Sequence, residues 1–142
     1  MIKFFKPEEE ERIISAIQSA EKNTSGEIRV HLEDNSKGDI MEEAIQTFAR
    51  LNMDKTEARN GVLIFLAPER KRFAIIGDEG INRLVPDNFW EEEKKVMMQH
   101  FRAQQFCEGI CKAIQLVGDR LKTHFPYQKG DINELPDDIS YS

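Results

Sequence analysis

The stretch NGVLIFLAPERKRFAIIG, residues 60–77, decides how this chain folds. Residues 62–66 form a continuous apolar run, which is typical of a central strand that is covered on both faces. Residues 72–76 give a second strand signal, and only a short turn of proline and charged residues separates the two. The pattern therefore predicts a β-hairpin with antiparallel strands at 62–66 and 72–76.

A third strand is predicted upstream of the hairpin, at residues 27–33. Apolar and polar side chains alternate there with a period of two, as expected for a strand with one buried face. Between the two strand signals, residues 39–51 place their apolar side chains on one side of a helix, and Asp39 takes the N-cap position. This order of strand, crossover helix and strand predicts that 27–33 and 62–66 run parallel.

The rest of the chain is predicted to be helical up to a polar C-terminal segment. The periodicity of apolar residues gives helices at 7–22, 79–84, 87–101 and 106–124. The chain length fits one domain, which we place at residues 1–126. Residues 127–142 are rich in acidic and turn-forming residues, so we expect them to form an acidic, loosely attached tail.

Composition limits the classes of function. The 142 residues are 39% hydrophobic and 32% charged, which fits a folded globular domain. The formal net charge of −6 has the wrong sign for a protein that binds nucleic acid. No apolar run approaches the roughly 20 residues of a membrane helix, and the first residues lack the apolar segment of a signal peptide. We therefore expect a cytoplasmic, monomeric protein that does not insert into a membrane.

Oxygen-bearing side chains are predicted to gather at one edge of the sheet. Glu27 and Asn60 lie at the starts of the two parallel strands. The third strand returns to that edge with Asp78 and Glu79, and Asp87 follows after a short loop. Carboxylate and amide oxygens suit calcium, with Mg²⁺ as the alternative, whereas zinc would require His or Cys. The sequence therefore predicts a calcium site at this corner.

The same corner also permits a purely structural interpretation. Gly77 and Gly80 flank the two carboxylates in a turn from strand to helix. In that turn Asp78 would cap the following helix and Glu79 would lie in its first turn. Capping and metal binding are compatible, so both interpretations stay open.

A second acidic cluster is predicted at the opposite edge of the sheet. Glu33, Asp34 and Asp39 follow the first strand, at the carboxyl ends of the parallel strands, where open α/β sheets usually bind ligands. The alternative is a solvated loop that ends in the helix cap. His31 alternates with apolar neighbours just before this cluster, and we expect it at a surface or interface rather than in a catalytic site.

Several motifs resemble those of the TPM domain family. They are TSGEIRV at residues 24–30, NGVLIFLAPERKRFAIIGDEGI at residues 60–81, and a helical half that contains Phe89 and Trp90. The resemblance covers roughly Phe5 to Phe125, and it is closest to the stand-alone, soluble bacterial branch of the family. It implies an α/β fold of three layers, an α/β/α sandwich in which helices cover both faces of a short mixed sheet.

The resemblance also implies a calcium site in some members of the family and a weak acid phosphatase activity proposed for others. Asp78 and Glu79 match the position of the family's acidic residues after the third strand. The usual GYGLE pattern is replaced here by GDEGIN, so the acidic residue that usually closes the motif falls near Asn82.

Three hypotheses about function follow. The first is a domain that binds a divalent cation and has a regulatory or scaffolding role, and the oxygen-rich corner favours it. The second is a metal-assisted acid phosphatase, for which the sequence offers no evident nucleophile, so no catalytic residue is assigned. The third is a protein–protein interaction module without catalysis, which contacts an unidentified protein partner through the acidic tail or through Phe89 and Trp90.

Overall fold

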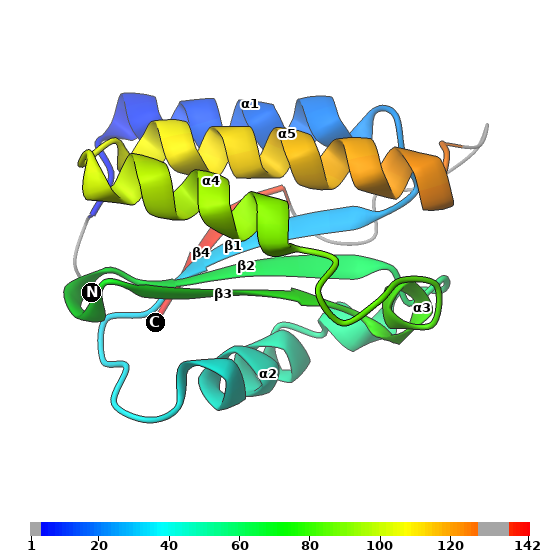
Figure 1. Ribbon diagram of the computed structural model, residues 1–142, viewed down its shortest axis with the longest axis horizontal. Coiled ribbons are helices and arrows are strands. Elements are labelled where there is room, and N and C mark those ends of the chain that lie inside the picture. The colour runs from blue at the N-terminus through cyan, green and yellow to red at the C-terminus, as the bar shows by residue number, and fades with distance from the viewer. Residues whose placement is uncertain (1–3, 128–136) are drawn as a thin grey trace.

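The computed structural model describes residues 4–127 and 137–142. A mixed four-stranded sheet lies between two layers of helices (Figure 1). The strands, in the spatial order β3-β2-β1-β4, are β1 (Glu27–Leu32), β2 (Gly61–Ala67), β3 (Arg72–Gly77) and β4 (Ile139–Tyr141). β1 runs parallel to β2 and to β4, whereas β2 and β3 are antiparallel. The predicted α/β sandwich, parallel pair and hairpin are therefore confirmed.

Helices cover the two faces of the sheet unequally. Three long helices lie side by side on one face: α1 (Pro7–Glu21), α4 (Glu91–Arg102) and α5 (Phe106–His124). The other face carries α2 (Ile40–Arg50), and a single helical turn, α3 (Glu79–Asn82), follows β3. Two 3-10 turns, Met53–Lys55 and Pro68–Arg70, precede and follow β2. Within residues 4–127 and 137–142, no helix combines the length and the apolar composition needed to cross a membrane.

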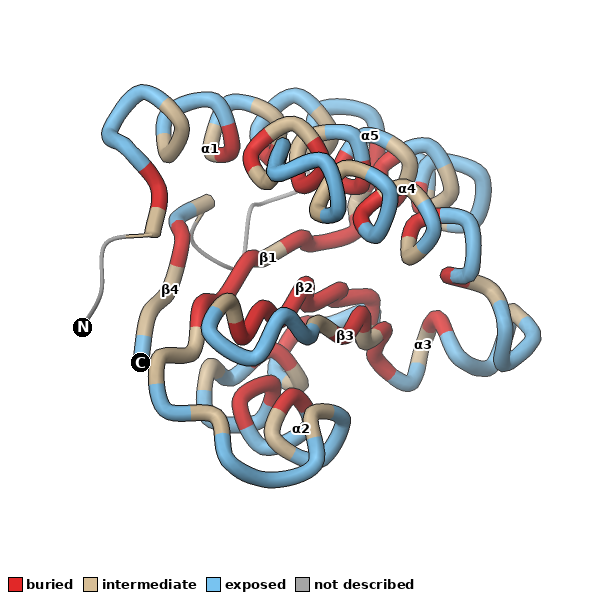
Figure 2. Tube along the Cα trace, turned by 60° about the vertical axis from the view of Figure 1, so that its left-hand side comes forward, coloured by how far each residue is buried: buried red, intermediate tan, exposed pale blue. Residues whose placement is uncertain are grey.

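Strand β2 is the centre of both cores. All seven of its residues are buried (Figure 2). Val62, Ile64 and Leu66 belong to the core under α1, α4 and α5. Leu63 and Phe65 point to the opposite face, where they belong to the smaller core under α2. This alternation confirms the prediction that the apolar run is a strand covered on both faces.

The C-terminal residues differ from the expected loosely attached tail. Residues 139–141 form β4, which pairs with β1 so that Val30 lies opposite Ile139 and Leu32 opposite Tyr141. Ile139 is 5% exposed and belongs to the main core, and this burial holds the short strand against the sheet. A three-residue strand is too short to give a periodic signal, which explains why the sequence did not reveal it. Residues 128–136 of the expected tail lie outside the described residues.

The start of β4 adjoins a buried carboxyl group at the end of α1. The Oε2 atom of Glu21 accepts a hydrogen bond of 2.8 Å from the backbone N–H of Ile28 in β1. Burial, together with a hydrogen bond to the carboxyl of Asp137, raises the pKa of Glu21 to about 10. At neutral pH the buried carboxyl group of Glu21 is therefore protonated.

Helices α1 and α5 approach closely at a pair of small residues. A Cβ atom built on Gly118 of α5 would lie 2.7 Å from the Cβ of Ala20 in α1, well inside van der Waals contact. Gly118 is also buried, so a larger side chain at this position has no solvent to move into. The spacing of the two helices over the sheet therefore depends on the absence of a side chain at Gly118.

We expect Gly118→Val to destabilise the protein by about 1–3 kcal/mol, because the added side chain forces α1 and α5 apart. Chemical denaturation followed by circular dichroism measures this change. The matched control is Gly38→Val, since a Cβ at Gly38 meets no atom within 4 Å. Equal effects of the two substitutions would show that helix contact is not the cause.

Candidate functional site

The corner after β3 is built around the carboxylate of Asp78. This residue is the N-cap of α3, and its Oδ1 accepts a hydrogen bond of 2.7 Å from the backbone N–H of Glu79. Its own backbone N–H donates to the carbonyl oxygen of Gly61 at 2.9 Å, which ties the corner to the start of β2. The side chain is only 6% exposed. The structural interpretation of the sequence, in which Asp78 caps a helix, is thus confirmed.

Arg59 neutralises this corner. Its guanidinium donates two parallel hydrogen bonds to Asp78, from Nε to Oδ2 at 2.9 Å and from Nη2 to Oδ1 at 3.0 Å. Its Nη1 atom lies 3.4 Å from Oε2 of Glu79, and Arg83 contacts the other oxygen of Glu79. The hydrogen bonds to Asp78 raise the pKa of Arg59 above its ordinary value. One cationic group therefore bridges the two carboxylates that the sequence assigned to a metal.

The backbone holds Arg59 in this position. Its φ of 52° lies in the left-handed region, which turns the chain sharply just before β2. The carbonyl oxygen of Arg59 accepts a hydrogen bond of 2.8 Å from the N–H of Gly80. A Cβ on Gly80 would come within 2.6 Å of that oxygen, so this close approach of α3 to the loop requires glycine.

An open hollow of about 470 Å³ lies beside the two carboxylates. Its polar lining comes from Asp78, Glu79, Asn82 and Arg83, and its apolar lining from the neighbouring side of α2 and from the end of β3. The Nδ2 atom of Asn82 donates a hydrogen bond of 3.0 Å to the carbonyl oxygen of Gly77. The corner is therefore accessible from solvent on the α2 face of the sheet.

The other predicted metal ligands lie elsewhere along the same edge. The alternation of β2 and β3 puts Asp78 on the α2 face and Asn60 on the opposite face. Asn60 is buried, and its amide nitrogen and oxygen have no hydrogen-bond partner among the described residues. Glu27 is buried at the start of β1, and Asp87 is exposed in the turn before α4. The structure thus brings Asp78 and Glu79 together and places Asn60 on the opposite face of the sheet.

Calcium chemistry fits the two neighbouring carboxylates, which offer hard oxygen ligands. The rest of the ligand set is not gathered at one point. In residues 4–127 and 137–142, no three His, Cys, Asp or Glu side chains are grouped so that they could hold a metal ion. A cation at this corner would therefore bind to Asp78 and Glu79 in competition with Arg59.

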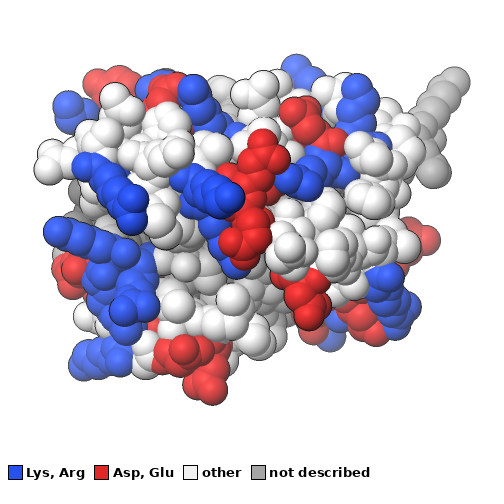
Figure 3. All heavy atoms as spheres, viewed as in Figure 1, with Lys and Arg blue, Asp and Glu red and all other residues white. Residues whose placement is uncertain are grey.

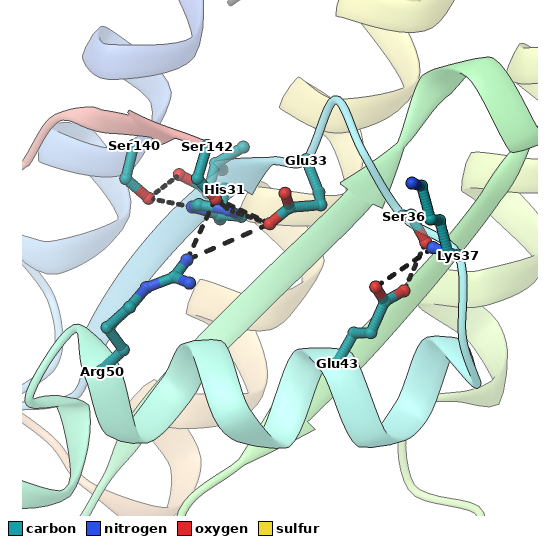
Figure 4. A network of polar contacts seen from close by, with 9 residues as sticks. His31, Glu33, Ser36, Lys37, Glu43, Arg50, Ser140 and Ser142 are labelled. Atoms are coloured by element: carbon teal, nitrogen blue, oxygen red, sulfur yellow. Dashed lines mark hydrogen bonds and ion pairs between the residues drawn. The ribbon is translucent and has the colours of Figure 1, made fainter.

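The opposite edge of the sheet holds a polar network around His31 (Figure 4). Nδ1 of His31 lies 2.7 Å from the hydroxyl of Ser140 in β4, and Nε2 lies 2.9 Å from the hydroxyl of Ser142. The Ser142 hydroxyl donates to Oε1 of Glu33 at 2.6 Å and accepts from Nη2 of Arg50 at 3.0 Å. The network therefore joins β1, β4 and α2 through side chains that satisfy one another.

His31 is a buried part of this network. It is 1% exposed and stacks on Phe65 of β2 with ring centroids 5.6 Å apart, so of the predicted surface or interface position the surface alternative was wrong. The reason is that β4, which the sequence did not reveal, covers the outer side of β1. Burial lowers the pKa of His31 and outweighs the opposite effect of Glu33, so the imidazole is neutral at pH 7.

The three residues of the predicted second site have separate roles. Glu33 belongs to the His31 network, and its hydrogen bonds from Ser142 and His31 outweigh burial and lower its pKa. The backbone N–H of Asp34 donates to the carbonyl oxygen of Ser142. Asp39 caps α2 by accepting a hydrogen bond of 3.0 Å from the N–H of Glu42. The interpretation of this segment as a loop that ends in a helix cap is confirmed for Asp39.

The sequence did not identify Arg59 as part of the corner. Arg59 lies in a polar segment between α2 and β2, where a single arginine carries no pattern. The sequence did contain one signal for the role of Arg59. This residue lies directly before Asn60 and the start of β2, and the antiparallel strand β3 ends beside that point. Because this topology brings Arg59 and Asp78 together, their opposite charges can pair.

Comparison with known proteins agrees with the family resemblance of the sequence motifs. A model of the TPM domain family matches residues 2–120. The NMR structure of the BA42 protein from the psychrophilic bacterium Bizionia argentinensis has 45% sequence identity and a TM-score of 0.94, covering 100% of this chain and 98% of that one. The N-terminal domain of a protein from P. gingivalis shares the fold, with 18% identity, a TM-score of 0.69 and coverage of 85% and 78%. A search of functionally curated proteins finds no match.

The buried, neutral His31 predicts a pH-dependent stability. The pKa of His31 is lowered in the folded state and is about 6.5 in the unfolded state. At pH values between these two, the unfolded chain binds more protons than the folded protein. The free energy of unfolding should therefore fall as the pH drops from 7.5 towards 5, and the loss ends once the pH is below the folded-state pKa.

We expect His31→Gln to flatten this dependence by up to about 1.4 kcal/mol per pH unit, the value for one proton. Urea denaturation at a series of pH values measures the slope. His124→Gln removes an exposed imidazole and serves as the control, since it should leave the slope unchanged. An unaltered slope in His31→Gln would contradict the assignment.

Proposed function

Since this chain belongs to the TPM domain family, we propose that it binds a divalent cation, with calcium preferred over Mg²⁺, at the corner formed by Asp78 and Glu79. The observation that supports the proposal most is the bridging position of Arg59, whose guanidinium lies 2.9–3.4 Å from oxygens of both carboxylates. Two neighbouring carboxylates that attract the guanidinium of Arg59 form a place where a metal cation is favoured in the same way.

The three side chains differ in their freedom to move. Asp78 is fixed, because it is 6% exposed and caps α3. Arg59 and Glu79 are 42% and 48% exposed, so both can rotate into solvent without disturbing the core. A cation can therefore replace the guanidinium on Asp78 while Glu79 adjusts to bind it.

The chemistry of the corner favours a hard cation. Calcium accepts six to eight oxygen ligands in irregular geometry, and water can supply those that the protein does not. The open hollow beside Asp78 and Glu79 leaves space for such water molecules. Mg²⁺ keeps more of its own water and demands octahedral geometry. The fixed carboxylate of Asp78 and the mobile carboxylate of Glu79 therefore suit Mg²⁺ less than calcium.

We propose binding rather than phosphoryl transfer. Among the described residues that line the hollow there is no hydroxyl, thiol or imidazole that would serve as a nucleophile or general base beside the carboxylates. The role that fits is regulatory or scaffolding: cation binding releases Arg59, which then presents a free guanidinium at the surface next to the site.

Competition with Arg59 gives the proposal a sharp test by isothermal titration of calcium into metal-free protein. We expect Asp78→Asn to abolish binding and Arg59→Gln to tighten it by about tenfold, equivalent to 1.4 kcal/mol, because the competing positive charge is removed. The gain in affinity cannot result from misfolding, which makes Arg59→Gln the decisive variant.

The matched control is Asp119→Asn, which removes an exposed carboxylate from α5 and should leave affinity unchanged. Calcium should also raise the thermal midpoint of Arg59→Gln more than that of the unmodified chain, because a ligand that binds only the folded state stabilises it. Absence of calcium heat from both the unmodified chain and Arg59→Gln at millimolar concentration would overturn the proposal.

A further inference from the structure

A second cavity, of about 530 Å³, lies at the other end of β3 from the Asp78 corner. It opens between the β2–β3 connection and the turn from α4 to α5. Five phenylalanine side chains contribute to its lining: Phe4, Phe5, Phe73, Phe101 and Phe106. Its volume falls within the range of about 300–1,000 Å³ that is typical of small-molecule sites.

The aromatic rings form a continuous wall. Phe73 meets Phe101 with ring centroids 5.5 Å apart, Phe101 meets Phe106 at 5.3 Å, and Phe106 meets Phe4 at 5.1 Å. These four rings are only partly buried, because residues 4–127 and 137–142 do not cover their cavity side. An apolar ligand would remove this aromatic surface from water, which is favourable by about 25 cal/mol per Å².

The rim of the cavity is positively charged. Lys71, Arg72 and Arg102 line it, and no acidic residue is among the lining side chains. In the part of the chain that the structure describes, none of these three side chains forms an ion pair or a side-chain hydrogen bond. Lys and Arg gather on the side of the molecule that contains the β2–β3 connection and the end of α4 (Figure 3). This is unexpected in a protein with a net charge of −6.

We propose that this cavity binds an amphipathic carboxylate, of the class of medium-chain fatty acids. The alkyl chain lies against the phenylalanine wall, and the carboxylate pairs with the guanidinium of Arg72 or Arg102 at the rim. Charge complementarity supports this occupant, since three cations that have no ion-pair partner among the described residues converge on an apolar cavity without an acidic lining residue. The planar guanidinium matches a carboxylate with two parallel hydrogen bonds.

Titration of the full chain with decanoate, followed by isothermal calorimetry and by NMR of the phenylalanine rings, tests this assignment. The buffer contains EDTA, which keeps calcium from both the protein and the fatty acid. We expect saturable binding of one decanoate per chain, with shifts at Phe73 and Phe101. Decanol, which has the same chain without charge, should bind about tenfold more weakly, and acetate should not bind.

The rim is tested by the double variant Arg72→Gln, Arg102→Gln, which should weaken decanoate binding by about tenfold. Both side chains are exposed, so the substitutions leave the core intact. The matched control is Lys95→Gln, Lys122→Gln, which removes the same charge from exposed positions of α4 and α5 and should bind decanoate normally. Asp78→Asn should also bind decanoate normally, which separates this site from the proposed cation site.

Four results would overturn the assignment: no saturable decanoate binding, equal affinity for decanol, equal weakening in both double variants, or binding to anionic vesicles without binding to monomeric decanoate. Dimer formation that buries the cavity, detected by sedimentation in the absence of ligand, would assign the apolar wall to a second copy of the chain instead.

Discussion

Burial of β2 on both faces is the constraint on which the rest of the structure depends. A strand that is covered by helices on both sides has no water with which to pair its backbone, so both of its edges need a neighbouring strand. β1 and β3 supply these edges, and the two cores supply the faces. Each of its large apolar side chains contributes about 1.5–3 kcal/mol when fully buried, which fixes the register of the whole sheet.

The same constraint determines where polar groups can lie. β1 and β2 start at the edge to which β3 returns, so the topology brings Glu27, Asn60 and Asp78 to one edge, as the order of elements in the sequence predicts. Strand alternation then separates Asn60 from Asp78, because Asp78 lies on the α2 face and Asn60 on the other. Element order alone therefore locates an edge but not a face. Predicting the face requires the register of each strand to the residue.

Local patterns reveal the hairpin and the long helices, whereas long-range contacts stay hidden. The hairpin is evident because residues 60–77 carry both strands and their turn within one stretch. β4 is not evident from the sequence, because burial of Ile139 and contacts with residues more than 100 positions away hold it in place. The contact of His31 with Ser140 is one example. The same distance in sequence explains why the burial of His31 could not be predicted. The pairing of Arg59 with Asp78 spans only 19 residues, yet it needs the register of β2 and β3 to become visible.

The distribution of positive charge connects these observations. Most arginines on the described surface are used within the fold: Arg59 pairs with Asp78, Arg70 with Glu43, and Arg120 with the fully buried Glu93. Each of these pairs joins two elements, and a carboxylate with such a partner loses less solvation energy on burial. Arg72 and Arg102 break this pattern, since they lie at the rim of an apolar cavity that has no acidic lining. Neighbouring arginines that have no acidic partner among the described residues cost Coulomb energy through their mutual repulsion, and an anionic ligand would remove that cost. The two ends of β3 therefore differ in electrostatic character. At one end two carboxylates are paired with Arg59 and Arg83, and at the other end three cations line an apolar cavity that has no acidic lining.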